Sequence, residues 1–281
     1  RMLDLPGRPA LSLTVDGEGP LDDFTANINL ASDGADRLAG TVTLRGSDDG
    51  AQTFGANLGG DLTAILLPQA REFLGEDIRL VVNGARTADG ALALDEFSLD
   101  AAAVELSGSL ATTPAGQPAR FDLTGTIAAE DGTPVTLPFG TGLTVGRADI
   151  AAQFDADQSE EVTARINLTD FAQPEMTIAS GTLDVTGTLT TGDSPAADLG
   201  VAAELAGVAF ADDALQQAVG ETLTAETRIL WSEGEDLRMQ NLDLQGTGYS
   251  AQVDAALAAG GGTSILTMQG QAALSDLGRF A

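Results

Sequence analysis

The side chains of this sequence that could carry out chemistry are its carboxylates. The candidate pairs of adjacent acids are 22–23, 160–161 and 212–213, and a pair of carboxylates can supply the acid and the base of glycoside hydrolysis. Each pair lies at an expected turn or helix start, where an acid serves solvation or capping. The chain has only one Trp and one Tyr, which leaves little aromatic surface for a sugar. We therefore expect turns and caps at these acids, and no glycosidase site.

Most other catalytic chemistries lack their residues. The sequence contains no His, no Cys and no Lys. This removes nucleophiles activated by His, thiolate and imidazole metal sites, and phosphate loops or Schiff bases that need Lys. The glycine cluster at 140–146 has the wrong spacing for a dinucleotide-binding loop, and no helix follows it. The sequence predicts neither an enzyme nor a cofactor.

Calcium binding is the remaining specific use for so many acids. The stretches "VDGEG" at 15–19 and "SDDG" at 47–50 are loosely suggestive. However, the chain has neither the twelve-residue EF-hand loop nor the glycine-rich nonapeptide repeat of calcium-binding β-rolls. We favour ordinary turn chemistry at these acids and leave a specific calcium site open.

Composition narrows the possible partners. The chain has 281 residues, is 43% hydrophobic and carries a net charge of −29, with Arg as its only basic residue. Such a charge opposes binding to nucleic acid or to the face of an anionic bilayer. The longest apolar run, 62–67, ends at Pro68, far short of the ~20 residues of a membrane-spanning helix. Because no signal peptide precedes the strand-like pattern at its start, we interpret the chain as part of a longer protein.

The elements that must position the side chains of this sequence are strands, which an alternation of apolar and polar residues predicts. In "EVTARINL" at 161–168, four apolar residues alternate with four polar ones, which gives a strand one apolar and one wet face. Short Gly- and Asp-rich turn signals separate many such stretches, so we expect an antiparallel meander. Clear alternation predicts strands at 11–15, 24–30, 54–58, 77–82, 121–127, 149–154, 162–168 and 183–189. Weaker alternation predicts strands at 41–45, 92–99, 103–110, 176–179, 199–208, 223–231, 237–244, 248–257 and 264–271.

Two short helices interrupt this strand pattern, and they belong to an internal repeat. "PQAREFLG" at 68–75 has Pro68 in its first turn and a glycine at its end. "DDALQQAVG" at 212–220 has Asp212 as its candidate N-cap residue and also ends at glycine. A shift of 145 residues aligns the two segments and the apolar positions after them without a gap. We predict two β-repeat units, 1–139 with a helix near 62–74 and 140–281 with a helix near 212–219, in one continuous sheet. Chance similarity of two amphipathic hairpins is the alternative.

With other chemistry removed, the apolar strand faces are the remaining candidate for function. They could form a sealed core between two packed sheets, which composition favours, or a trough that contacts acyl chains, which the repeat favours. The candidate groove residues are Leu11, Leu13, Val15, Phe24, Ile28, Leu30, Ile78, Leu80, Val82, Phe121, Leu123, Ile127, Val162, Ile166, Leu168, Leu183 and Val185.

Several stretches resemble one protein family. "RPALSLTVDGEGPLDDFTANINL" (8–30), "FGANLGGDLTAILLPQAREFLGEDIRL" (54–80), "DGALALDEFSLDAAAVELSGSL" (89–110) and the echo at 213–257 resemble interior segments of TamB-type proteins of the AsmA-like family, in their α-proteobacterial form. The resemblance implies a mainly β fold: an elongated, curled antiparallel repeat sheet, or β-taco-like trough, with two short helices. The N-terminal anchor and the conserved C-terminal domain of that family are not in this stretch of sequence.

The resemblance also implies a function. It implies the periplasmic portion of an inner-membrane-anchored bacterial protein that carries phospholipid acyl chains between inner and outer membranes and supports outer-membrane biogenesis. It implies an outer-membrane barrel partner of the TamA type, bound through other parts of the protein. The alternative is a purely structural or adhesive β-repeat protein with a sealed core.

Overall fold

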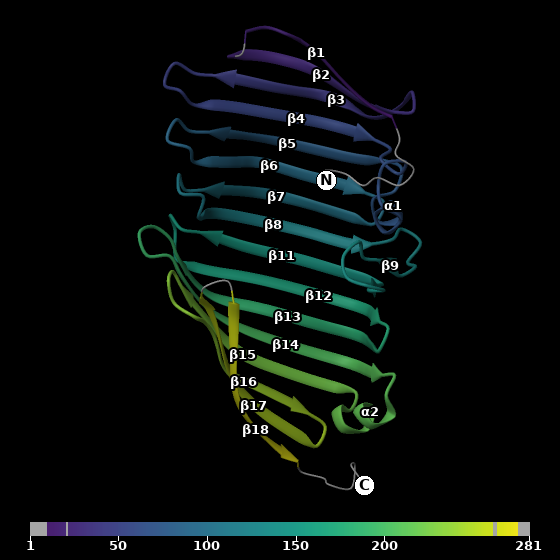
Figure 1. The fold of residues 1–281 in the computed structure, drawn as a ribbon, viewed down its shortest axis with the longest axis vertical. Coiled ribbons are helices and arrows are strands. Elements are labelled where there is room, and N and C mark those ends of the chain that lie inside the picture. The colour runs from purple at the N-terminus through teal and green to yellow at the C-terminus, as the bar shows by residue number, and fades with distance from the viewer. Residues whose placement is uncertain (1–9, 21, 261–262, 275–281) are drawn as a thin grey trace. The chain divides into compact units, whose positions relative to one another are not determined.

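The computed structural model describes residues 10–20, 22–260 and 263–274 (Figure 1). These residues form antiparallel β-sheet with two short helices, so the predicted mainly β fold class is confirmed. The chain divides into two compact units, Arg1–Gly140 (unit 1) and Thr141–Ala281 (unit 2).

Unit 1 is a meander of eight long strands in which each strand pairs antiparallel with the next. Helix α1, Pro68–Leu74, lies between the fourth and fifth of these strands, and it contacts the two-residue strand β9, Val135–Thr136 (Figure 1). The long strands are β1 Leu11–Glu18, β2 Asp23–Ser32, β3 Ala35–Gly46, β4 Gln52–Gly60, β5 Ile78–Arg86, β6 Leu92–Ala101, β7 Val104–Thr112 and β8 Pro118–Ala128.

Unit 2 repeats this order of elements. Its eight long strands also pair antiparallel, each with the next along the chain. The two-residue strand β10, Thr144–Val145, pairs with the second of them. Helix α2, Asp213–Val219, follows the fourth long strand. The long strands are β11 Arg147–Asp155, β12 Glu161–Gln173, β13 Met176–Thr190, β14 Ala196–Phe210, β15 Thr222–Ser232, β16 Leu237–Gly246, β17 Tyr249–Gly260 and β18 Thr263–Leu274.

Local sequence explains the turns and helix ends. Asp33 and Gly34 alone connect β2 to β3, and both have positive φ, 52° and 82°, as a two-residue hairpin turn requires. Pro68 occupies the first turn of α1, where its missing N–H is not needed. Asp212 caps α2 by accepting the N–H of Leu215 at 2.8 Å. The helix limits predicted at Pro68, Gly75, Asp212 and Gly220 are therefore confirmed.

From the helices onward, the elements of the two units correspond at a constant offset of 145 residues. α1 corresponds to α2, and β6 to β16, residue for residue. Gly75 and Gly220 end the helices with nearly the same backbone angles, φ 66° and ψ −161° against φ 80° and ψ −166°. The ladder β4–β5 pairs Gly60 with Ile78, and β14–β15 pairs the equivalent residues at 205 and 223.

One register shift of the sheet recurs at the same offset. The β6–β7 ladder shifts register between Leu94 and Phe97, and the β16–β17 ladder shifts between Met239 and Leu242. The last ladder of each unit differs: β7–β8 pairs Leu110 with Phe121, whereas β17–β18 pairs Ala255 with Met268, two residues beyond the equivalent position 266. A shift of two leaves every side chain on its original face.

Two predicted strands are one in the structure. The stretches 176–179 and 183–189, expected as separate strands, both belong to β13. The alternation is interrupted at Gly181, but this glycine pairs with Leu168 and Leu205. Those two leucines fill the space beside it, since a Cβ built there would lie 2.8 Å from Leu205. The interruption is therefore a packing site within a strand, not a break.

Few side chains are fully buried. The buried apolar residues of unit 1 gather mainly where α1 and β9 meet the strand ends, and Phe154 and Val162 pair directly in unit 2. The buried apolar set is Ala26, Phe73, Ile78, Ala103, Val135, Leu137, Val145, Ala148, Phe154, Val162, Ile178 and Val208. Most other apolar strand residues are only half-buried.

Candidate functional site

The register of unit 1 brings its predicted groove residues onto one face. Directly opposed residues share a face, so pairing from β1 to β8 defines rows across the sheet. One row runs Val15, Ile28, Gly40, Leu58, Leu80, Leu99, Leu106 and Gly125. All twelve candidates of this unit lie on the same face as that row: Leu11, Leu13, Val15, Phe24, Ile28, Leu30, Ile78, Leu80, Val82, Phe121, Leu123 and Ile127.

Unit 2 has an equivalent apolar face. Its five candidates, Val162, Ile166, Leu168, Leu183 and Val185, lie on one face of β12 and β13. The row through Ile166 continues across the sheet as Ile150, Ile166, Leu183, Ala203, Ala225, Leu244, Ala251 and Ala272. We call these two surfaces the apolar faces of unit 1 and unit 2.

The opposite face of the same strands is polar. In unit 2, Arg165 donates to Asp184 and Arg228 donates to Asp198 across neighbouring strands. These hydrogen bonds lower the pKa of both aspartates below its ordinary value and raise the pKa of both arginines. The guanidinium groups therefore lie on the wet side, one residue away from the apolar rows.

The candidates differ in exposure. Ile78 and Val162 are buried, at 5% and 6% exposed, whereas Leu11, Leu13 and Val15 on β1 are 44%, 64% and 54% exposed. The other twelve are half-buried: Phe24, Ile28, Leu30, Leu80, Val82, Phe121, Leu123, Ile127, Ile166, Leu168, Leu183 and Val185. Within each unit the described strands belong to one sheet. Because most of the candidate residues are exposed or half-buried, other molecules can contact the apolar face over most strands.

Register also identifies apolar-face residues that sequence reasoning did not name. Leu58, Leu99 and Leu106 lie in the row through Leu80, and Leu205 and Leu223 lie in the row through Leu168. These residues alternate with polar ones in the sequence, but the alternation is weaker or interrupted by glycine. It therefore did not show that they share a face with the candidate residues. The rows through Leu80 and Ile166 contain no charged side chain, and on the apolar face of unit 1 a charged residue, Arg86, lies at the end of β5 opposite Gln52 and Leu92.

Two of the three candidate acidic pairs have a member with a structural role. Asp23 forms an ion pair with Arg45, and Asp212 caps α2. Asp49 of "SDDG" accepts hydrogen bonds from the Ser47 hydroxyl and the Ala51 N–H within a hairpin turn, which lower its pKa. Across residues 10–20, 22–260 and 263–274, His, Cys, Asp and Glu form no group of three or more that could hold a metal ion.

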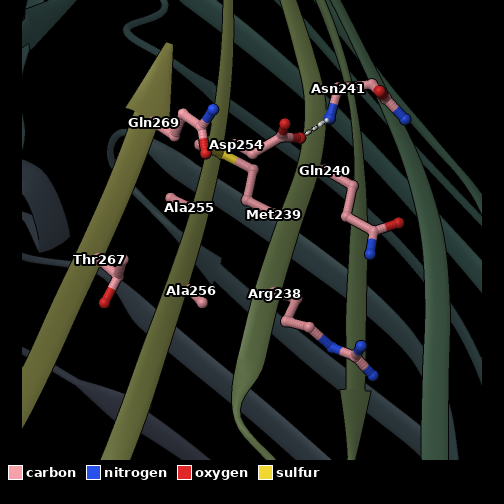
Figure 2. A pocket seen from close by; sticks show the side chains of 9 residues that line it. All are labelled: Arg238, Met239, Gln240, Asn241, Asp254, Ala255, Ala256, Thr267 and Gln269. Carbon is pink, nitrogen blue, oxygen red and sulfur yellow. Dashed lines mark hydrogen bonds between the residues drawn. The ribbon is translucent and has the colours of Figure 1, made fainter.

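One depression lies over β16–β18, beside the register shift of β16. It has a volume of about 440 Å³ and is lined by Arg238, Met239, Gln240, Asn241, Asp254, Ala255, Ala256, Thr267 and Gln269 (Figure 2). Asn241, with φ 50°, donates its backbone N–H to Asp254 Oδ1 at 2.7 Å. That carboxylate therefore supports the irregular backbone of β16.

Comparisons with known proteins add no relative. Searches against protein-family models, curated proteins and solved structures find no match. Among the described helices, none is both long and apolar enough to cross a membrane.

Proposed function

We propose that this chain is a lipid-carrying segment of a TamB-like protein, in which acyl chains lie along the apolar faces. One observation carries the proposal: each unit presents rows of Leu, Ile, Val, Phe and Ala without a charged side chain, and most of these residues are only half-buried. Large exposed apolar surfaces usually mark binding sites.

The physical advantage of such a face is simple. An acyl chain that leaves a bilayer for water loses about 0.8 kcal/mol for each exposed CH₂ group. Contact with a continuous apolar face offsets most of this loss. The row through Ile166 supplies aliphatic contacts on strand after strand, so a chain can move between strands without complete hydration. This transfer needs no catalytic residue and no cofactor.

The cellular setting follows from the family resemblance. We propose a periplasmic location, as part of an inner-membrane-anchored bacterial protein that moves phospholipid toward the outer membrane and supports its biogenesis. A barrel partner of the TamA type would bind other parts of that protein.

Site-specific photo-crosslinking tests the proposal. A photoreactive residue at Leu80, Leu123 or Ile166, on the apolar faces, should capture phospholipid from cells or vesicles. Matched probes at Arg79, Thr124 and Asn167 occupy neighbouring positions on the exposed polar faces and should not. Equal capture by both sets, or by neither, would refute the proposal and favour a structural β-repeat protein. Mass spectrometry of the purified chain should also detect phospholipid.

A further inference from the structure

We infer that unit 2 accepts phospholipids with zwitterionic headgroups, such as phosphatidylethanolamine, in preference to anionic ones. This inference rests on the proposed function and adds a substrate class to it. It starts from where a headgroup could lie. The apolar face has no charged side chain along the row through Ile166 or the neighbouring row through Leu168. A phosphate is costly to desolvate there, so the headgroup must remain at the strand ends, in water.

The basic groups of unit 2 are already neutralised. All four arginines that the structure describes in this unit have a carboxylate partner: Arg147 with Asp149, Arg165 with Asp184, Arg228 with Asp198 and Arg238 with Glu235. Each lies on the polar side of its strand. A lipid phosphate would have to displace a carboxylate to obtain a guanidinium partner, and the displaced acid would remain beside it.

The strand ends reached by such a headgroup carry surplus negative charge. Three loops of unit 2 lie at the same end of the strands, because the strands that they join alternate in direction. These loops are 156–160, 191–195 and 233–236. Their exposed acids, with the first residue of β12, are Asp157, Glu160, Glu161, Asp193, Glu233, Glu235 and Asp236. Arg238, the nearby base, is held by Glu235 at 3.1 Å.

The charges of these loops should separate lipids by net charge. Charges within about 10 Å of one another interact at moderate salt, so an anionic headgroup at this edge meets several unbalanced carboxylates. The ammonium of an ethanolamine headgroup meets the same carboxylates favourably, which compensates its phosphate. The preference is therefore electrostatic and should weaken as salt rises.

A competition experiment tests this inference with the complete chain. The photoreactive residue at Ile166 is exposed to vesicles of equimolar phosphatidylethanolamine and phosphatidylglycerol, and the captured lipids are quantified by mass spectrometry. At low salt we expect phosphatidylglycerol to be depleted about threefold relative to its share in the vesicle. Because both lipids come from the same vesicle, repulsion between protein and vesicle affects them alike.

A matched pair of variants locates the effect. The first variant combines Asp157→Asn, Glu160→Gln and Glu161→Gln; it removes three charges and should reduce the depletion of phosphatidylglycerol. The second combines Asp157→Glu, Glu160→Asp and Glu161→Asp; it keeps the three charges and should leave that depletion unchanged. Lipid capture in the vesicle's own proportions, or enriched in phosphatidylglycerol, would overturn the inference and leave the proposed function standing. Absence of any lipid at Ile166 would overturn both.

Discussion

Ile166 lies directly opposite Leu183 across β12 and β13, while Arg165 and Asp184, one residue along, pair on the opposite face. A single step along either strand thus exchanges an aliphatic contact for an ion pair. Ile166→Lys should therefore lower lipid capture by a photoreactive residue at Leu183 by about tenfold, because a charge would enter the apolar row. Asn167→Lys, on the exposed polar face, is the control and should leave capture unchanged. Similar losses in both variants would contradict the proposed role of this row.

Gly75 should be intolerant of substitution. Its φ of 66° with ψ of −161° is a conformation that side chains rarely adopt, and an added Cβ would lie 2.4 Å from the Ala102 Cβ. We expect Gly75→Ala to cost about 1–3 kcal/mol, measured as a lower urea midpoint. Adding Ala102→Gly should restore only part of the loss, because the backbone strain remains. Gly200→Ala, whose Cβ would meet only Thr186 at 3.5 Å or more, is the control and should change little.

The two helices should respond differently to mutation. Phe73 of α1 is buried, at 8% exposed, whereas the equivalent residue of α2 is Ala218 and α2 buries none of its residues. Phe73→Ala should cost about 3–5 kcal/mol and lower Tm. Asp212→Ala removes only a cap, which is worth about 1 kcal/mol, and should mainly raise amide exchange at Leu215. A larger fall in Tm from Asp212→Ala than from Phe73→Ala would show that α2 is the more tightly integrated helix.

Asp61 gives the stability a defined pH dependence. Its carboxylate accepts the Thr63 hydroxyl and the Thr63 N–H, at 2.8 Å for the N–H, which lower its pKa. A lowered folded-state pKa contributes stability above the unfolded pKa, near 4, and this contribution is lost as pH falls through the folded value. Asp61→Asn should therefore cost less than about 1 kcal/mol at pH 7 and a smaller amount at pH 2. An equal cost at both pH values would contradict this assignment.

Alternation predicted the faces well because it is a local property. The sequence from 161 to 168 was enough to assign Ile166 to one face and Asn167 to the other, and Asp212 and Gly75 marked helix limits through their own backbone preferences. Burial was harder to predict, since it depends on what lies across the strand. Val162 is buried beside Phe154, yet Leu13 in a similar pattern is 64% exposed on β1.

The register shifts had a sequence signal that period-two reasoning does not use. Apolar residues fall at 92, 94, 97 and 99, so the spacing is three between Leu94 and Phe97, where the extra residue lies. The same spacing occurs between Met239 and Leu242. An alternation template counts such a step as noise, although it marks a bulge that restores the apolar side. Whether lipids use the seventeen candidates stays a prediction, because side-chain placement alone names no ligand.

The two-residue difference between the β7–β8 and β17–β18 ladders has an evolutionary consequence. In a pair of duplicated units, one hairpin can slide by two positions while its apolar side chains stay together. A slide of one position would have exposed a row of Leu and Ala side chains on the polar face and placed Gln and Asp on the apolar face. Strands in such a protein should therefore lengthen, shorten and slip in even steps, unless a bulge supplies the odd residue. Relatives of this chain should show hairpin insertions and deletions that respect this parity, while their loops vary freely.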